Sequence, residues 1–101
     1  MDVVFADTAR WDIAEIYDTI ALNNPAAALR VEALIREKCG RLAEFPYSGY
    51  KTNRTNVFRL PLVRYPYVIY YRVDVDLDRV VIACVIHAAR IKNLRRAPPI
   101  P

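Results

Sequence analysis

The stretch that decides the fold is Val80-Val81-Ile82-Ala83-Cys84-Val85-Ile86, in which every side chain is apolar. A strand with one face in water alternates between apolar and polar residues, whereas an unbroken apolar run is typical of a strand that is covered on both faces. The stretch therefore predicts a central strand, which we expect to span Arg79–Ile86.

Two further strands are predicted just before it, at Val57–Pro61 and Tyr67–Asp74, because β-branched and aromatic residues are frequent in both segments. The segments that connect the three strands, 62–66 and 75–78, are short enough to be hairpin connections. The C-terminal half is therefore expected to form a three-stranded antiparallel meander.

The N-terminal half predicts a strand and two helices. Residues 2–6 are short, β-branched and aromatic, as in a strand, and Asp7 or Thr8 can cap the helix that follows. Along that helix one face is apolar and the other polar: Ile13, Ile16, Tyr17 and Ile20 line the first, whereas Asp12, Glu15 and Thr19 point away. Asn24 and Pro25 suit the N-cap and first position of a second helix that should reach about Ala43. The short join favours an antiparallel helical hairpin.

The order of these elements predicts an α+β domain, in which the helical hairpin packs on one face of a twisted sheet and the opposite face stays partly open. With 101 residues, of which 54% are hydrophobic, the chain suits one compact core, which we place at residues 1–96. Residues 97–101 include three prolines, which cannot join a strand ladder, and are expected to form a flexible tail. Residues 44–56 predict a loop that brings Lys51 and Arg54 to the surface.

Charge is distributed unevenly along the chain, whose formal net charge is +4. Residues 1–50 carry five basic and eight acidic side chains, a balance of −3, whereas residues 51–101 carry ten basic and three acidic ones, a balance of +7. The second half is therefore a candidate surface for a polyanion or for an acidic protein partner. From charge alone, a basic face that only meets solvent is an equal alternative.

Several classes of chemistry lack their residues in this chain. Cys39 and Cys84 lie far apart in apolar segments, where we expect them to be inert core residues. One histidine and two isolated cysteines offer no metal-ligand spacing, and two glycines cannot build a phosphate loop, so we expect neither metal nor cofactor. The only serine, Ser48, lacks the setting of a hydrolase nucleophile. Without a signal peptide or an apolar run of membrane length, we expect a cytoplasmic protein with no membrane partner.

Six segments of the chain stand in an order and at intervals that are shared with a known superfamily. They are Asn24-Pro25-Ala26-Ala27, Leu42 to Pro46, Gly49, Val57-Phe58-Arg59-Leu60, Tyr67-Val68-Ile69-Tyr70-Tyr71-Arg72-Val73 and Val85-Ile86-His87-Ala88-Ala89-Arg90. Together they resemble the RelE/ParE toxins of type II toxin–antitoxin systems, and the ParE branch more closely than the other. The resemblance extends over roughly residues 1–92.

The resemblance implies a small toxin that is neutralised by a neighbouring antitoxin, whose C-terminal segment wraps the toxin's surface. In ParE-like members the target is DNA gyrase, and in RelE-like members it is mRNA in the ribosomal A site. The fold does not choose between these targets, because function belongs to the site and not to the scaffold.

His87 and Arg90 are the candidate catalytic residues. His87 is the only histidine and ends the last predicted strand, and Arg90 follows three residues later, so one tight turn could aim both at a phosphate. They match the His-x-x-Arg-like ending of the family, although a histidine at a strand end is often a structural hydrogen-bonding group. The RNA-cleaving branch also carries an arginine where this chain has Val68, and a tyrosine or histidine beyond Arg90 that this chain lacks. This departure favours a toxin without chemistry of its own.

A set of basic residues is expected to bind an acidic antitoxin or a gyrase surface. It comprises Arg59, Arg64, Arg72, Arg90, Lys92, Arg95 and Arg96. Interleaved with them are Tyr65, Tyr67, Tyr70 and Tyr71, which would offer stacking platforms for bases if exposed but are typical of half-buried strands.

Three functions remain open from the sequence. The first is a ParE-like gyrase inhibitor held by a cognate antitoxin. The second is a RelE-like, ribosome-dependent mRNA endonuclease that uses His87 and Arg90. The third is a degenerate module that keeps only its affinity for the antitoxin.

Overall fold

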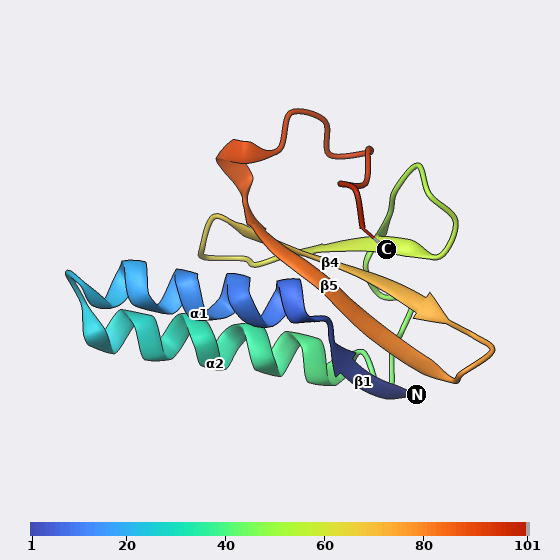
Figure 1. The fold of residues 1–101 in the computed structure, drawn as a ribbon, viewed down its shortest axis with the longest axis horizontal. Coiled ribbons are helices and arrows are strands. Elements are labelled where there is room, and N and C mark those ends of the chain that lie inside the picture. The colour runs from blue at the N-terminus through green and yellow to red at the C-terminus, as the bar shows by residue number, and fades with distance from the viewer. Residues whose placement is uncertain (101) are drawn as a thin grey trace.

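The computed structural model describes residues 1–100, which form a mixed five-stranded sheet with a helical hairpin on one face (Figure 1). The elements are β1 (Asp2–Phe5), α1 (Asp7–Ala21), α2 (Pro25–Arg41), β2 (Tyr50–Lys51), β3 (Val57–Pro61), β4 (Tyr67–Asp74), β5 (Arg79–His87) and the short 3-10 helix η1 (Ala88–Arg90). The strand order is β1-β5-β4-β3-β2, with β1 parallel to β5 and the other neighbours antiparallel. The predicted α+β fold, with its hairpin and its meander β3–β4–β5, is confirmed.

Local differences from the prediction have physical causes. The strand β2 lies inside the predicted loop 44–56. The sequence did not predict it, because two residues are too few to show the alternation of a strand. The N-cap of α1 is Ala6, which has no side-chain acceptor, so the prediction of Asp7 or Thr8 is wrong. Asp7 instead lies in the first turn, where its carboxylate pairs with Arg10 at 3.3 Å. Asn24 is confirmed as the N-cap of α2, since its side chain accepts the Ala27 N–H at 3.0 Å.

The main core lies between the helices and the sheet. Its fully buried members come from both layers: Ile13, Val31, Ile35, Cys39, Leu42, Ile69, Tyr71, Val80, Ile82 and Val85. Cys39 in this core and Cys84 on the opposite face are both free and buried, as predicted, and burial raises the pKa of each thiol to about 12. A thiol with so high a pKa holds almost no thiolate at neutral pH, which makes both cysteines poor nucleophiles.

The C-terminal segment 91–100 covers part of the sheet face that the helices leave free. There Val68, Tyr70 and Cys84 form a small apolar cluster, against which Ile91 and Ile100 pack. Hydrogen bonds tie the segment to the loop between β2 and β3: the Asn53 N–H donates to the Arg95 carbonyl at 2.6 Å, the Ala97 N–H to Asn53 Oδ1 at 2.8 Å, and Arg54 Nη1 to the Ile100 carbonyl at 2.8 Å. Mobility of the tail stays a prediction, and Pro101 lies outside the described residues.

Gly49 fixes the loop before β2 against the sheet. Its N–H donates to the Tyr71 hydroxyl at 2.9 Å, and Tyr71 is fully buried. A Cβ on Gly49 would lie 2.7 Å from that hydroxyl oxygen and 2.8 Å from the Arg59 carbonyl oxygen, both held by the core. Gly40, within α2, has nothing within 4 Å of such a Cβ.

We therefore predict opposite effects for two glycine-to-alanine substitutions. Gly49→Ala should lower the free energy of unfolding by about 1–3 kcal/mol, because the new methyl group overlaps fixed atoms. Gly40→Ala should raise it by up to about 1 kcal/mol, since alanine is the better helix former. Urea titration followed by circular dichroism measures both, and an unchanged midpoint for Gly49→Ala would contradict the packing described for Tyr71.

Candidate functional site

His87 and Arg90 come together in one cleft, as their spacing predicted. β5 ends at His87 and η1 ends at Arg90, and both residues line a cavity of about 350 Å³ against α1. His87 Nδ1 accepts the Ala89 N–H at 3.0 Å, and its ring stands edge-on to Tyr67 with centroids 5.3 Å apart. The imidazole thus caps η1, so in its neutral form the proton resides on Nε2.

The opposite wall of this cleft is acidic. β1 pairs with β5 only as far as Ile82, so the Val85 N–H lies beyond the end of β1. Asp12 on α1 supplies the missing acceptor, with Oδ2 2.9 Å from the Val85 nitrogen. The pKa of Asp12 is raised, mainly because the carboxyl group is partly buried. The Val85 hydrogen bond lowers this pKa, the charge of Glu15 raises it, and the charge of Arg90 lowers it. The prediction that Asp12 points away from the core is wrong. Its side chain turns toward β5, because the Val85 N–H needs a hydrogen-bond acceptor there.

The cleft therefore holds two carboxylates and one arginine, since Glu15 lines it as well. Among the described residues, neither Asp12 nor Glu15 has a cationic group within 4.0 Å. A phosphate entering this cleft would meet two carboxyl groups beside the one arginine, whereas phosphodiester cleavage requires added positive charge around the developing transition state. The cleft suits a neutral or cationic group better than it suits RNA.

The predicted basic residues divide into separate groups. Arg59 pairs with Tyr70 across β3 and β4, and Arg72 lies two residues beyond Tyr70, so both belong to the face away from the helices. The Arg59 guanidinium lies over the Tyr50 ring at 4.6 Å, and Arg72 pairs with Asp74 at 3.6 Å. Arg72 is therefore paired, whereas Arg59 has no carboxylate within 4.0 Å among the described residues, and its buried Nε has no hydrogen-bond partner there.

The remaining basic residues gather mostly at the C-terminal segment. Arg90, Lys92 and Arg96 line a cavity of about 370 Å³ that has Tyr70 on the sheet side and Pro98 and Pro99 on the other. Arg95 is exposed in the same segment, whereas Arg64 is exposed in the turn between β3 and β4. Of the predicted set, the structure groups Arg90, Lys92 and Arg96 and leaves Arg64 apart.

The four tyrosines of the predicted ladder are structural residues. Tyr70 and Tyr71 are buried on opposite faces of β4, and Tyr65 and Tyr67 pack against the main core. The alternation expected along the strand is confirmed. These rings are not free platforms for bases.

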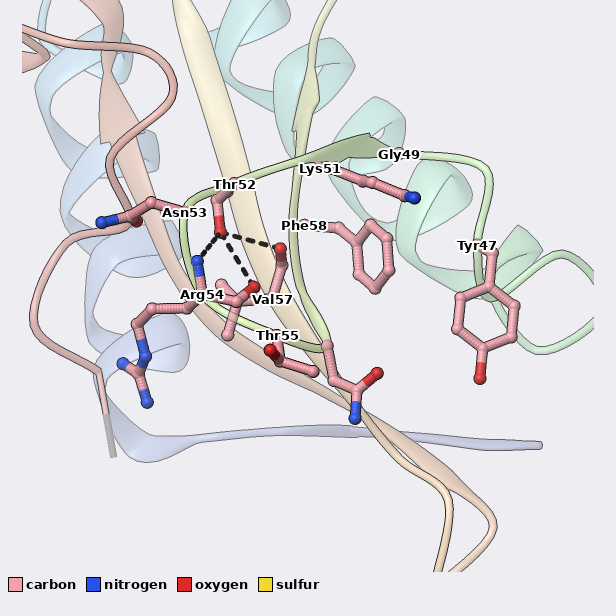
Figure 2. Close-up of a pocket in the computed structure, with 10 residues that line it drawn as sticks. Tyr47, Gly49, Lys51, Thr52, Asn53, Arg54, Thr55, Val57 and Phe58 are labelled. Atoms are coloured by element: carbon pink, nitrogen blue, oxygen red, sulfur yellow. Dashed lines mark hydrogen bonds between the residues drawn. The ribbon is translucent and has the colours of Figure 1, made fainter.

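The sequence did not predict a cavity of about 580 Å³ that lies at the β2–β3 hairpin (Figure 2). It is lined by Tyr47, Gly49, Lys51, Thr52, Asn53, Arg54, Thr55, Asn56, Val57 and Phe58. The sequence placed Lys51 and Arg54 on the surface, but a loop of mixed polar residues gave no sign of a concave shape. The one feature of the sequence that could have indicated the cavity is that Lys51 and Arg54 follow Tyr47 with no acidic residue between them.

Within residues 1–100, no three His, Cys, Asp or Glu side chains gather closely enough to share a metal ion. No helix in the same range is both long and apolar enough to cross a membrane.

Solved structures with the same fold come from toxin–antitoxin systems. The chromosomal ParDE system of P. aeruginosa aligns with a TM-score of 0.74 and 23% identity, over 86% of this chain and 95% of that chain. The isolated E. coli RelE toxin aligns with a TM-score of 0.67 and 16% identity, over 90% and 87%. The toxin–antitoxin complex RelBE2 of Mycobacterium tuberculosis aligns with a TM-score of 0.61 and 28% identity, over 85% and 88%.

At the level of sequence, a comparison with curated proteins finds no match. The family model described as "ParE toxin of type II toxin-antitoxin system, parDE" matches residues 3–92, which is most of the chain and includes every strand and helix as far as η1, apart from Asp2 of β1. The chain therefore belongs to the ParE toxin family of type II toxin–antitoxin systems.

Proposed function

We propose that this protein is a toxin that binds and inhibits DNA gyrase, that it does not cut RNA, and that a cognate antitoxin neutralises it. Membership of the ParE family supports the choice of target. Two of the structural relatives are toxin–antitoxin systems or complexes, which supports the antitoxin as a partner. The observation that carries the proposal is the acidic wall of the His87 cleft.

That wall argues against a ribonuclease. In a metal-free cleavage, cationic and hydrogen-bonding groups must stabilise the extra charge of a pentacoordinate phosphate, and two groups must transfer protons. Here the one arginine of the cleft faces Asp12 and Glu15, and the ring nitrogen Nδ1 of His87 is taken by the Ala89 N–H. Val68, where the RNA-cleaving branch carries an arginine, is 4% exposed and packs with Tyr70. Arg90 is thus the one lysine or arginine among the described residues that lines this cleft.

The C-terminal segment supplies the binding surface in this proposal. Lys92, Arg95 and Arg96 are exposed there, and no carboxylate among the described residues pairs with them within 4.0 Å. Exposed ion pairs contribute about 0.2–1 kcal/mol each, so several are needed for an appreciable effect. Their larger contribution is to orient and accelerate the approach of an acidic partner.

An mRNA endonuclease remains the second candidate, because one specific observation favours it. His87, Arg90 and Tyr67 line the same cleft, and these three side-chain types could transfer protons and bind a phosphate. A degenerate module that binds only the antitoxin is the third candidate. The experiments below separate all three.

The first test of this proposal concerns the target of the toxin. Purified toxin should inhibit supercoiling by DNA gyrase, and His87→Ala should inhibit it as strongly as the native chain, because the cleft performs no chemistry. Primer extension on mRNA translated in the presence of the toxin should show no new ends. Cuts inside codons that disappear in His87→Ala or Arg90→Ala would establish the endonuclease instead.

The second prediction concerns the basic segment. The double variant Arg95→Glu with Arg96→Glu should weaken gyrase inhibition about tenfold or more, since each lost pair is worth up to about 1 kcal/mol and repulsion replaces it. The control is Arg30→Glu with Arg41→Glu, which makes the same change of charge at exposed positions on α2. An equal loss of gyrase inhibition in both double variants would show that only the net charge matters. It would contradict the assignment of the C-terminal segment to the interface.

The third prediction concerns the antitoxin. Expression of the toxin alone should arrest growth of a susceptible host, and co-expression with the protein of the neighbouring gene should restore it. The two proteins should then co-purify as one complex. Harmless expression of a folded, antitoxin-binding chain would leave the degenerate module as the answer.

A further inference from the structure

The β2–β3 hairpin forms a pocket that the proposed gyrase inhibition does not use. Its volume of about 580 Å³ is in the range typical of small-molecule sites. Figure 2 shows Lys51 and Tyr47 around the Phe58 ring, and Arg54 on the other side of the hairpin with its guanidinium directed away from them. The pocket is separate from the His87 cleft, with which it shares no lining residue.

An aromatic ring is held at this pocket in a fixed position. Tyr47 is 56% exposed, yet its ring contacts Phe58 edge-on, with centroids 5.7 Å apart and planes at 72°. Phe58 is buried and stacks on buried Tyr71, with centroids 5.4 Å apart. Because the Tyr47 ring rests on this packed pair, much of its surface stays available to a flat ligand without further ordering cost.

The charge of the pocket is positive. Lys51 and Arg54 line it, both are exposed, and neither has a carboxylate within 4.0 Å among residues 1–100. The Arg54 guanidinium donates from Nη1 to the Ile100 carbonyl, and Ile100 packs on the sheet face opposite to Phe58, so Lys51 is the cation on the Tyr47 side of the pocket. In contrast to the His87 cleft, no acid belongs to this lining, so an anion meets no repulsion from it.

The walls of the pocket are held in place by the fold. Thr52 Oγ1 donates to the Val57 carbonyl at 2.9 Å and accepts the Arg54 N–H at 3.2 Å, which closes the hairpin. Asn56 adopts a left-handed backbone conformation, with φ 63°, and its carbonyl accepts the Val73 N–H at 2.9 Å. Asn53 is tied to the C-terminal segment. A loop fixed at so many points keeps its concave shape before any ligand arrives.

We propose that this pocket binds a nucleotide unit, with the base against Tyr47 and the phosphate at Lys51. Base stacking on an aromatic ring beside basic groups is the usual way in which proteins hold single-stranded nucleic acid. A free nucleotide and a nucleotide of a single strand share this chemistry. An acidic peptide would use the Lys51 charge but would gain little from the flat ring.

The experiment measures binding of the full-length chain to a fluorescein-labelled 12-nucleotide single-stranded DNA by anisotropy. Tyr47→Phe should bind like the native chain, because it keeps the ring, whereas Tyr47→Leu should bind about 5- to 150-fold more weakly through loss of one stacked base. Lys51→Gln should reduce the slope of log affinity against log salt by about 0.7, as expected for one lost phosphate contact on a single strand. Arg30→Gln on α2 is the matched charge control and should change binding less than Lys51→Gln.

Competition with unlabelled AMP and with a glutamate-rich peptide completes the test. Displacement by AMP assigns a free-nucleotide site, and displacement by unlabelled oligonucleotide alone assigns a strand site; either result supports the proposal. Equal binding by the native chain and Tyr47→Leu, both with native thermal unfolding, would overturn it. Absence of binding to both DNA and AMP, or displacement by the acidic peptide at lower concentration than by AMP and oligonucleotide, would overturn it too.

Discussion

The fold depends on the enclosure of β5. β1 and β4 pair with its two edges, the helices cover one of its faces through Ile82 and Val85, and the C-terminal segment lies near Cys84 on the other. An apolar strand with one bare face would leave a patch prone to association. The segment 91–100 therefore completes the domain, and its position accounts for the unbroken apolar run of this strand.

The unequal lengths of β1 and β5 set the charge of the His87 cleft. Since β1 stops opposite Ile82, the Val85 N–H needs an acceptor, and Asp12 reaches it from α1 at 2.9 Å. A half-buried carboxylate is the result, placed where a phosphate would have to approach Arg90. A requirement of backbone hydrogen bonding thus places a carboxyl group in the same cleft as Arg90.

Much of the fold, but less of the site, could be predicted from the sequence. The bounds of β3 and β4 follow from β-branched and aromatic content, and the start of α2 follows from Asn24 and Pro25, because these signals are local. The contact of Asp12 with Val85 joins residues 73 positions apart, and the β2–β3 pocket depends on how Tyr47 returns to Phe58. Neither contact produces a periodic pattern along the sequence, so neither could be predicted from it. The approach of His87 to Arg90 could be predicted because only three residues separate them.

Asn53 joins the two basic surfaces of the molecule. Its N–H and its side chain hold the C-terminal segment at Arg95 and Ala97, and the same residue lines the β2–β3 pocket. A partner that lifted this segment from the sheet would break these hydrogen bonds and that of Arg54 with Ile100, and would expose the apolar cluster around Tyr70. The segment carries Lys92, Arg95 and Arg96, so its removal would also move the charges that we assign to target binding. In our proposal, any protein that occupies this face competes with the target for the same surface.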